Sequence, residues 1–147
     1  MKKIMILSLV FLCGMVLRSG AEEKLTWLTD LSTAQAKAKA EHKLVVMDFT
    51  GSDWCYWCKK LNSEIFSSSD FAAYAAKNLV LVEVDFPQAK AQSDALKKAN
   101  QALQTKFKVE GYPTIIVLNG EGKKVGELGY MEGGPKPFIA QLAKLKG

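Results

Sequence analysis

The sequence predicts an α/β fold in which a mixed sheet lies between layers of helices. Apolar runs alternate with segments whose apolar residues recur at helical spacing, an order typical of strands joined by crossover helices. A turn signal separates the last two runs, which should therefore form a hairpin. The expected strands are 44–49, 79–86, 114–118 and 123–129. The expected helices are 33–41, 55–66, 71–77, 88–107 and 136–145.

The run from Leu44 to Phe49 is the central strand of this prediction. It is nearly all apolar, as expected for a strand that is covered on both faces. The early strands should pair in parallel through right-handed crossovers, and the final hairpin should be antiparallel. A site is then expected at the carboxyl end of the central strand. Asp48 is the only carboxylate within this run, and a buried carboxylate is destabilising unless it has a partner or a task.

The flanking segments carry start and stop signals. Asp30 or Ser32 can cap the first helix, and residues 27–28 are expected to pack on the core. Pro87 should end the second strand. The segment 88–107 lacks proline and glycine, so one long helix is expected there. The inner face of that helix should carry Leu96, Ala99, Leu103 and Phe107.

The N-terminal segment, 1–21, is predicted to be a secretory signal peptide. A basic start precedes a short apolar run, and small residues follow it. Cleavage is expected after Ala21, which leaves 22–147 as one domain. The apolar run is shorter than the ~20 residues that a membrane span needs, and an uncleaved anchor is the less favoured alternative. Lipid attachment at Cys13 is disfavoured because bulky residues precede it.

The charge of the predicted domain is small and scattered. The whole chain has a formal net charge of +5, which falls to +2 when the cations of the predicted signal peptide, Lys2, Lys3 and Arg18, are removed. Dispersed lysines are typical of a solvated surface. The basic stripe that nucleic-acid binding needs is missing from the sequence, which argues against a nucleic-acid partner.

Two cysteines remain in the predicted domain, Cys55 and Cys58, and both fall at the start of the helix that follows the central strand. Residues three apart on a helix lie roughly 5–6 Å from each other, a separation that suits a disulfide. The helix N-terminus should lower the thiol pKa of Cys55, whereas Cys58 should be more buried. The hypothesis is that Cys55 is the attacking thiolate and Cys58 resolves the mixed disulfide.

A redox pair is favoured over a structural disulfide or a metal site. So short a disulfide loop adds little chain-entropy stabilisation. Structural zinc usually has four protein ligands, but the domain offers only these cysteines and His42, which is interpreted as a surface residue. A metallochaperone for a soft ion such as Cu(I) is a further alternative, disfavoured because methionine and histidine do not flank the motif. We expect no resident metal and no cofactor.

The pattern resembles the thioredoxin superfamily. The matching segments are Val46-Met47-Asp48-Phe49, Trp54-Cys55-Tyr56-Trp57-Cys58-Lys59, Val82-Glu83-Val84-Asp85 and Gly111-Tyr112-Pro113-Thr114-Ile115. They occur in the family's order and span most of residues 40–146. The chain is most similar to exported single-domain members with a WCxWC motif. This resemblance implies a thioredoxin-like three-layer fold for residues 22–147.

The resemblance also implies roles for individual residues. Pro113 should be cis and face the cysteines, leaving the Tyr112 backbone free to pair with an extended substrate. Trp54 matches the family position before the first cysteine. Asp48 is similar to the buried aspartate that helps to move protons, although the loop from it to Cys55 is one residue longer than in thioredoxin. A strand-end or loop hydrogen bond is the other interpretation of Asp48.

Tyr56 and Trp57 depart from the family pattern, since thioredoxin has Gly-Pro between its cysteines and oxidising relatives often have histidine there. These aromatic residues could form an apolar docking surface or cover the disulfide. Taken together, the sequence predicts a periplasmic or secreted, monomeric thiol:disulfide oxidoreductase, with a lean towards reductase or isomerase. Its partners would be protein thiols or disulfides and a redox partner. The alternative is a non-catalytic module that binds peptides or proteins.

Overall fold

The computed structural model describes residues 24–146, so the predicted signal peptide lies outside the described residues. One sheet has the strand order β1-β3-β2-β4-β5. The strands are β1 (Trp27–Leu28), β2 (Leu44–Thr50), β3 (Leu79–Asp85), β4 (Thr114–Leu118) and β5 (Lys124–Leu128). The α-helices are α1 (Leu31–Glu41), α2 (Tyr56–Leu61), α3 (Ser69–Asn78), α4 (Asp94–Phe107) and α5 (Pro135–Leu145). A π-helical turn, Asn62–Phe66, continues α2.

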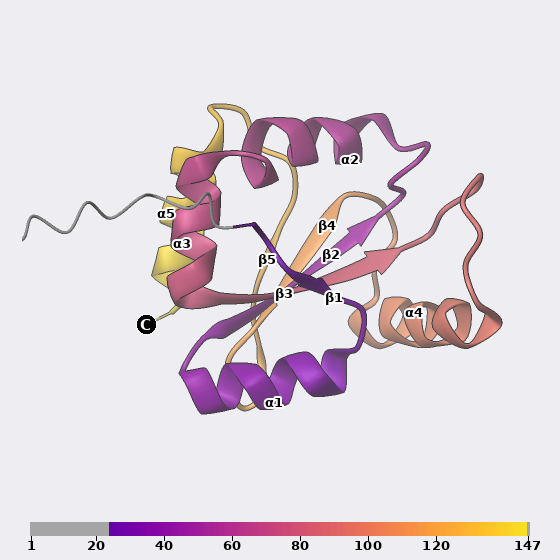
Figure 1. Cartoon of the computed structure of the whole chain (residues 1–147), viewed down its shortest axis with the longest axis horizontal. Helices are drawn as coiled ribbons and strands as arrows, with labels where there is room; N and C mark the ends of the chain where they lie inside the picture. Colours follow the sequence, from indigo (N-terminus) through magenta and orange to yellow (C-terminus); the bar gives the residue numbers. More distant parts are fainter. Residues whose placement is uncertain (1–23, 147) are drawn as a thin grey trace, which may run out of the picture.

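The sheet lies between two layers of helices, which confirms the expected three-layer α/β fold (Figure 1). β1, β3 and β2 pair in parallel, whereas β4 is antiparallel to β2 and forms the expected hairpin with β5. Helices α2, α3 and α5 cover one face of the sheet, and α1 and α4 cover the other. Strands that alternate with helices can bury both faces of a sheet only in this way.

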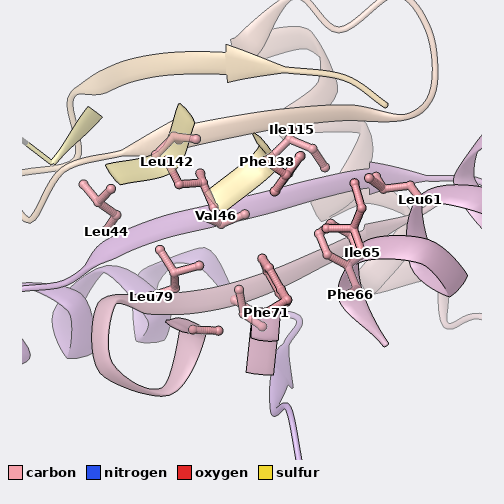
Figure 2. Packing of buried hydrophobic residues seen from close by; sticks show 13 residues of the cluster. Leu44, Val46, Leu61, Ile65, Phe66, Phe71, Leu79, Ile115, Phe138 and Leu142 are labelled. Atoms are coloured by element: carbon pink, nitrogen blue, oxygen red, sulfur yellow. The ribbon is translucent and has the colours of Figure 1, made fainter. Parts of the chain in front are cut away.

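The core on the α2 side is aromatic. Figure 2 shows this cluster, in which Val46 and Ile115 of the sheet pack with Phe71 of α3 and Phe138 of α5. The rings of Phe66 and Phe71 have centroids 5.0 Å apart, and Phe138 meets both edge-on at 5.9 and 6.1 Å. Because Phe66 belongs to the turn that extends α2, this packing fixes the helix on which the cysteines lie.

Residues Trp27 and Leu28, expected only to pack on the core, also form the edge strand β1. They pair with Leu81 and Val82 of β3. A strand of two residues has no periodicity, so the sequence gives no sign of it. The pairing ends at Val82, and the rest of β3 has no further neighbour on this edge among the described residues.

The expected helix 88–107 is wrong in its first part, because α4 begins at Asp94. The Asp53 carboxylate accepts hydrogen bonds from the backbone amides of Gln88, Ala89 and Lys90 at 3.0, 2.6 and 2.9 Å. These amides would otherwise belong to the first turns of the helix. A tertiary contact with the loop before the cysteines therefore overrides the local helix propensity.

The expected inner face of α4 also needs correction. Ala99 is exposed, whereas its neighbour Asn100 is buried. The Asn100 side chain donates from Nδ2 to the backbone oxygen of Asp85 at 2.9 Å. A polar residue takes the central position on this helix because the backbone carbonyl of Asp85, at the end of β3, accepts hydrogen bonds there from Asn100 and from Gln92.

Replacing Asp53 should loosen the segment 86–93. Asp53→Ala removes the acceptor of three amides, so we expect a lower Tm and faster hydrogen exchange at Gln88, Ala89 and Lys90. Accepting the Gln88 amide lowers the pKa of Asp53. Its stabilising effect is therefore present at neutral pH and lost as the pH falls through that lowered pKa.

The matched control is Glu121→Ala, which removes an exposed carboxylate from the turn between β4 and β5. An Asp53→Ala protein whose amide exchange matched that of this control would contradict the anchoring role of Asp53.

Candidate active site

Cys55 and Cys58 form a disulfide, with their Cα atoms 5.3 Å apart. Cys55 is the N-cap of α2, and Cys58 lies in the first turn of that helix. The Cys58 amide donates to the Cys55 sulfur at 3.2 Å. The pair therefore lies where the sequence places it, at the carboxyl end of β2 and the start of a helix.

The two cysteines are about equally buried, at 6% and 4% exposed for Cys55 and Cys58. Cys55 is therefore less exposed than expected for the tip of a helix. The asymmetry lies in their positions instead. The Cys55 sulfur caps the helix and accepts a backbone hydrogen bond, and such a position stabilises a thiolate. This position agrees with the expectation that Cys55 is the attacking thiolate, which stays a prediction here.

The loop before the cysteines is held against the end of β3. The Cys55 amide donates to the Gly51 oxygen at 2.8 Å, and the Trp54 indole nitrogen donates to the Phe86 oxygen at 2.8 Å. The indole of Trp54 lies on Gly51, where an added Cβ would overlap the ring. Only glycine leaves this space, so Gly51 positions Trp54, which is still 43% exposed beside Cys55.

Tyr112 and Pro113 are joined by a cis peptide bond, as the resemblance implied. Thr114 pairs with Phe49, which brings Pro113 to the same end of the sheet as the cysteine loop. The Tyr112 ring stacks on Phe86 at 5.1 Å and meets Trp54 edge-on at 6.0 Å. Gln104 of α4 donates to the Tyr112 hydroxyl at 2.8 Å. Tyr112 and Trp54 thus form one wall next to the disulfide.

Tyr56 and Trp57 are exposed, at 66% and 49% of their surface. The Trp57 ring lies 5.2 Å from Tyr56 and 5.2 Å from Tyr130. Lys60 places its ammonium 5.4 Å from the Trp57 ring and 5.2 Å from the Tyr130 ring, within the range of a cation–π contact. We call Tyr56, Trp57 and Tyr130 the aromatic surface.

Sequence reasoning missed Tyr130, Lys60 and Glu64 as parts of this site. The Tyr130 hydroxyl donates to Glu64 at 2.6 Å, and Lys60 lies 3.8 Å from the same carboxylate. Lys60 and Glu64 are four residues apart on one helix and could have been paired from sequence. Tyr130 follows β5 and could not, because only the fold brings it to the helix.

Asp48 lies in the middle of the sheet and is 8% exposed. Burial raises its pKa to about 8, and the neighbouring carboxylates of Glu83 and Asp85 add to this shift. The buried Oδ1 of Asp48 accepts no hydrogen bond from residues 24–146. A strand-end or loop hydrogen bond therefore does not account for this atom. Asp48 can gain or lose a proton near neutral pH.

A pocket of about 280 Å³ connects Asp48 with the disulfide. Its lining residues are Asp48, Thr50, Ser52, Cys58, Lys59, Asn62, Glu83 and Lys90. Cys58, rather than Cys55, borders this pocket. The extra residue in the loop before Cys55 therefore does not separate Asp48 from the second cysteine. Across the described part of the chain, histidine, cysteine and carboxylate side chains form no cluster of three or more that could hold a metal ion.

The three-layer fold, the paired cysteines at a helix start and the cis-proline at the same end of the sheet define a dithiol–disulfide redox protein of the thioredoxin type. The sequence model of the thioredoxin-like domain matches residues 31–146. The chain belongs to the thioredoxin-like family and is a thiol:disulfide oxidoreductase.

Individual relatives agree with this membership. The chain is 36% identical to the disulfide bond reductase DsbH of Chlamydia pneumoniae over 122 residues, which cover 83% of this chain and 73% of the relative. A solved structure of a DsbH oxidoreductase superposes with a TM-score of 0.81 at 35% identity, covering 88% of this chain and 89% of that one. The thioredoxin-related protein DsbJ of Chlamydia pneumoniae is 29% identical over 107 residues, 73% of this chain and 31% of DsbJ.

Burial of Asp48 should make stability depend on pH. Its pKa is about 8 when folded, against an ordinary value of 3.8. Between these values only the folded state holds the proton, so its contribution to stability is complete at low pH and is lost as the pH rises towards 8. Each pH unit in this window should lower the unfolding free energy by up to about 1.4 kcal/mol.

The measurement compares urea unfolding of the oxidised protein and of Asp48→Asn across this window. The free-energy difference between the two should change in favour of the variant as the pH rises. Asp94→Asn, in the exposed first turn of α4, is the control. The difference between its unfolding free energy and that of the wild type should stay constant across this window. Parallel pH curves for wild type and Asp48→Asn would contradict a raised pKa.

Proposed function

We propose that the protein is an extracytoplasmic reductase of protein disulfides, in which Cys55 attacks, Cys58 resolves and Asp48 exchanges the proton. The observation that carries this proposal is the Cys55–Cys58 disulfide at the start of α2, with Cys58 facing the same pocket as the buried Asp48. A structural staple would need neither that pocket nor a carboxyl group with a raised pKa.

The reaction begins with the reduced pair. The Cys55 thiolate attacks a substrate disulfide, forms a bond to one substrate sulfur and releases the other as a thiolate. Cys58 then loses its proton to Asp48 and attacks the Cys55 sulfur. The Cys55–substrate bond breaks, the electron pair leaves on the second substrate sulfur, and that sulfur takes a proton from water. The substrate gains two electrons and the Cys55–Cys58 pair is oxidised.

The burial of Asp48 makes it a suitable acceptor of the Cys58 proton in the second step. A pKa of about 8 makes its carboxylate a stronger base than an ordinary aspartate and brings it close to the usual thiol pKa. Proton transfer to Asp48 from a thiol of ordinary pKa is nearly balanced, which is the condition for efficient general base catalysis. The same group can return a proton when the reaction runs in the opposite direction.

Substrate binding is assigned to the surface around the disulfide. The backbone of Tyr112, before the cis-proline Pro113, can pair with an extended peptide. Trp54 forms the wall beside Tyr112, and Tyr56 and Trp57 of the aromatic surface extend the apolar area on the other side of Cys55. Exposed aromatic residues of this kind are typical of binding surfaces rather than of a plain solvated helix.

The direction and the location rest on separate arguments. A reductase is favoured because the relative with 36% identity is itself named a disulfide bond reductase and because no histidine lies between the cysteines. Export is proposed from the signal-like pattern in residues 1–21. None of the helices in residues 24–146 is both long and apolar enough to cross a membrane. The electron donor would be a dithiol protein, and we expect the domain to act as a monomer.

A binding module is the second candidate, because Trp54, Tyr56 and Trp57 are all exposed around the motif. Such a module would hold an extended peptide without redox turnover. Capture of a reduced, unfolded substrate that survives replacement of both cysteines by serine, without any acceleration of disulfide reduction by the wild type, would favour this function.

The order of the two cysteines can be tested with serine variants. Cys58→Ser should accumulate a mixed disulfide between Cys55 and a chain of insulin. Cys55 still attacks an insulin disulfide, but the thiol that would resolve the product is missing. Cys55→Ser should give no acceleration of insulin reduction over dithiothreitol alone. Turbidity measures the rate, and mass spectrometry measures the trapped species. Trapping by Cys55→Ser instead of Cys58→Ser would reverse the assigned order.

The aromatic surface should affect protein substrates more than small ones. Trp57→Ala should raise the KM for insulin by about tenfold, the loss of ~1.4 kcal/mol of contact energy. The rate with a small disulfide such as hydroxyethyl disulfide should stay close to that of the wild type. Tyr130→Phe, which keeps the ring and loses the hydroxyl, is the control. An equal loss of rate with both substrates would show that Trp57 affects the reactivity of the disulfide rather than the binding of the substrate.

A further inference from the structure

A second carboxyl group, Glu83, lies next to Asp48 and has no role in the steps above. Asp48 of β2 and Glu83 of β3 are register partners in the parallel ladder, so their side chains lie on the same face of the sheet. Glu83 is half-buried, whereas Asp48 is buried. Burial, and then the charge of Asp85, raises the pKa of Glu83. The Glu83 side chain is thus less buried than that of Asp48 and more accessible to solvent.

Glu83 lines two pockets. The first is the pocket of about 280 Å³ that contains Asp48 and Cys58. The second, of about 250 Å³, is lined by Asn100 of α4, whose buried Oδ1 accepts no hydrogen bond from the described residues. Lys90 also borders both pockets. The first pocket is lined mostly by polar side chains, the second has both polar and apolar lining, and each is large enough to admit water.

The opening at Glu83 follows from the sheet. β1 pairs with β3 only at Leu81 and Val82, so among residues 24–146 the edge of the ladder has no strand partner from Glu83 onwards. The second pocket occupies this place, with Thr29, which follows β1, in its lining. A longer first strand would have closed the edge and isolated Asp48 from this side. The short β1 therefore leaves Glu83, the register partner of Asp48, at an unpaired edge that the second pocket borders.

The other charged groups around Glu83 either make hydrogen bonds to other residues or are exposed to solvent. Asp85 of β3 accepts hydrogen bonds from the amide and hydroxyl of Ser52 at 2.9 and 2.6 Å. Lys90, from the loop after β3, donates to the Ser52 hydroxyl at 2.8 Å, and its charge lowers the pKa of Glu83 in part. Lys59 of α2 lines the first pocket and is exposed.

We propose that Glu83 relays the proton between Asp48 and solvent, so that the buried base is reset after each turnover. The inference rests on the proposed role of Asp48 in accepting the Cys58 proton. After Cys58 has attacked Cys55, protonated Asp48 passes its proton through pocket water to the Glu83 carboxylate, which releases it on the open edge. Glu83 ends as it began, and no electrons pass through it. It is a positioning and relay residue and does not touch the sulfur atoms.

The proposal is tested by buffer rescue. With reduced protein in single turnover against a peptide that holds one internal disulfide, Glu83→Ala should resolve the mixed disulfide about tenfold more slowly in dilute buffer, less than the ~100-fold or more of a direct acid–base group. Imidazole, a small diffusible proton carrier, should restore the rate as its concentration rises. The wild-type rate should not depend on imidazole.

Matched variants separate the possible outcomes. Glu83→Gln keeps the size of the side chain and cannot carry a proton, so it should be slow in dilute buffer even if Glu83→Ala does not fold. Glu121→Gln, at the opposite end of the sheet from the cysteines, should behave as the wild type. A slow Glu83→Ala that imidazole leaves slow would overturn the relay, because a structural defect is not rescued by a proton carrier.

Asp48→Asn distinguishes this inference from the proposed function. If it resolves the mixed disulfide as fast as the wild type, the proton role of Asp48 fails and the relay fails with it. If it is slow while Glu83→Gln and Glu83→Ala match the wild type at every imidazole concentration, only the relay is overturned.

Discussion

The pairing of β2 with β3 along their full length is the constraint on which the site depends. The ladder runs from Leu44 opposite Leu79 to Thr50 opposite Asp85. It aligns the carboxyl ends of both strands and places Asp48 beside Glu83 on the face that α2 covers. A slip of one residue in either strand would turn its carboxyl group to the α1 side and separate the two groups from each other. The apolar residues of both strands oppose such a slip, because in each strand they alternate between the two cores.

A small set of polar contacts then fixes the cysteine loop to the end of β3. Ser52 binds Asp85, Asp53 binds the amides of 88–90, and Trp54 binds the Phe86 carbonyl. These contacts accommodate the additional residue in the loop between Asp48 and Cys55. Cys58 therefore still lines the pocket that contains Asp48. The same contacts delay the start of α4. One set of hydrogen bonds therefore shapes both the redox loop and the opening beside Glu83.

Much of the fold was predictable from sequence, and so was the pair of cysteines. The strands around 44–49 and 114–118 are strongly apolar, and the cysteine motif follows a strand directly, so local signals were sufficient. The predictions that failed depend on distant partners. The residues before Asp94 look helical but donate their amides to Asp53, and Asn100 replaces Ala99 on the inner face because Asp85 offers a carbonyl. Tyr130 joins the aromatic surface only through packing against Trp57.

The sequence by itself determined the family, the order of the elements and the spacing of Cys55 and Cys58, because these follow from hydrophobic periodicity and from residues close together in the chain. Tertiary structure decided which groups surround the disulfide. The burial that raises the pKa of Asp48, the adjacent carboxyl group of Glu83 and the contact of Tyr130 with Glu64 each join segments that are far apart in sequence. Electrostatic environment is a property of neighbours in space, and only the folded chain brings those neighbours together.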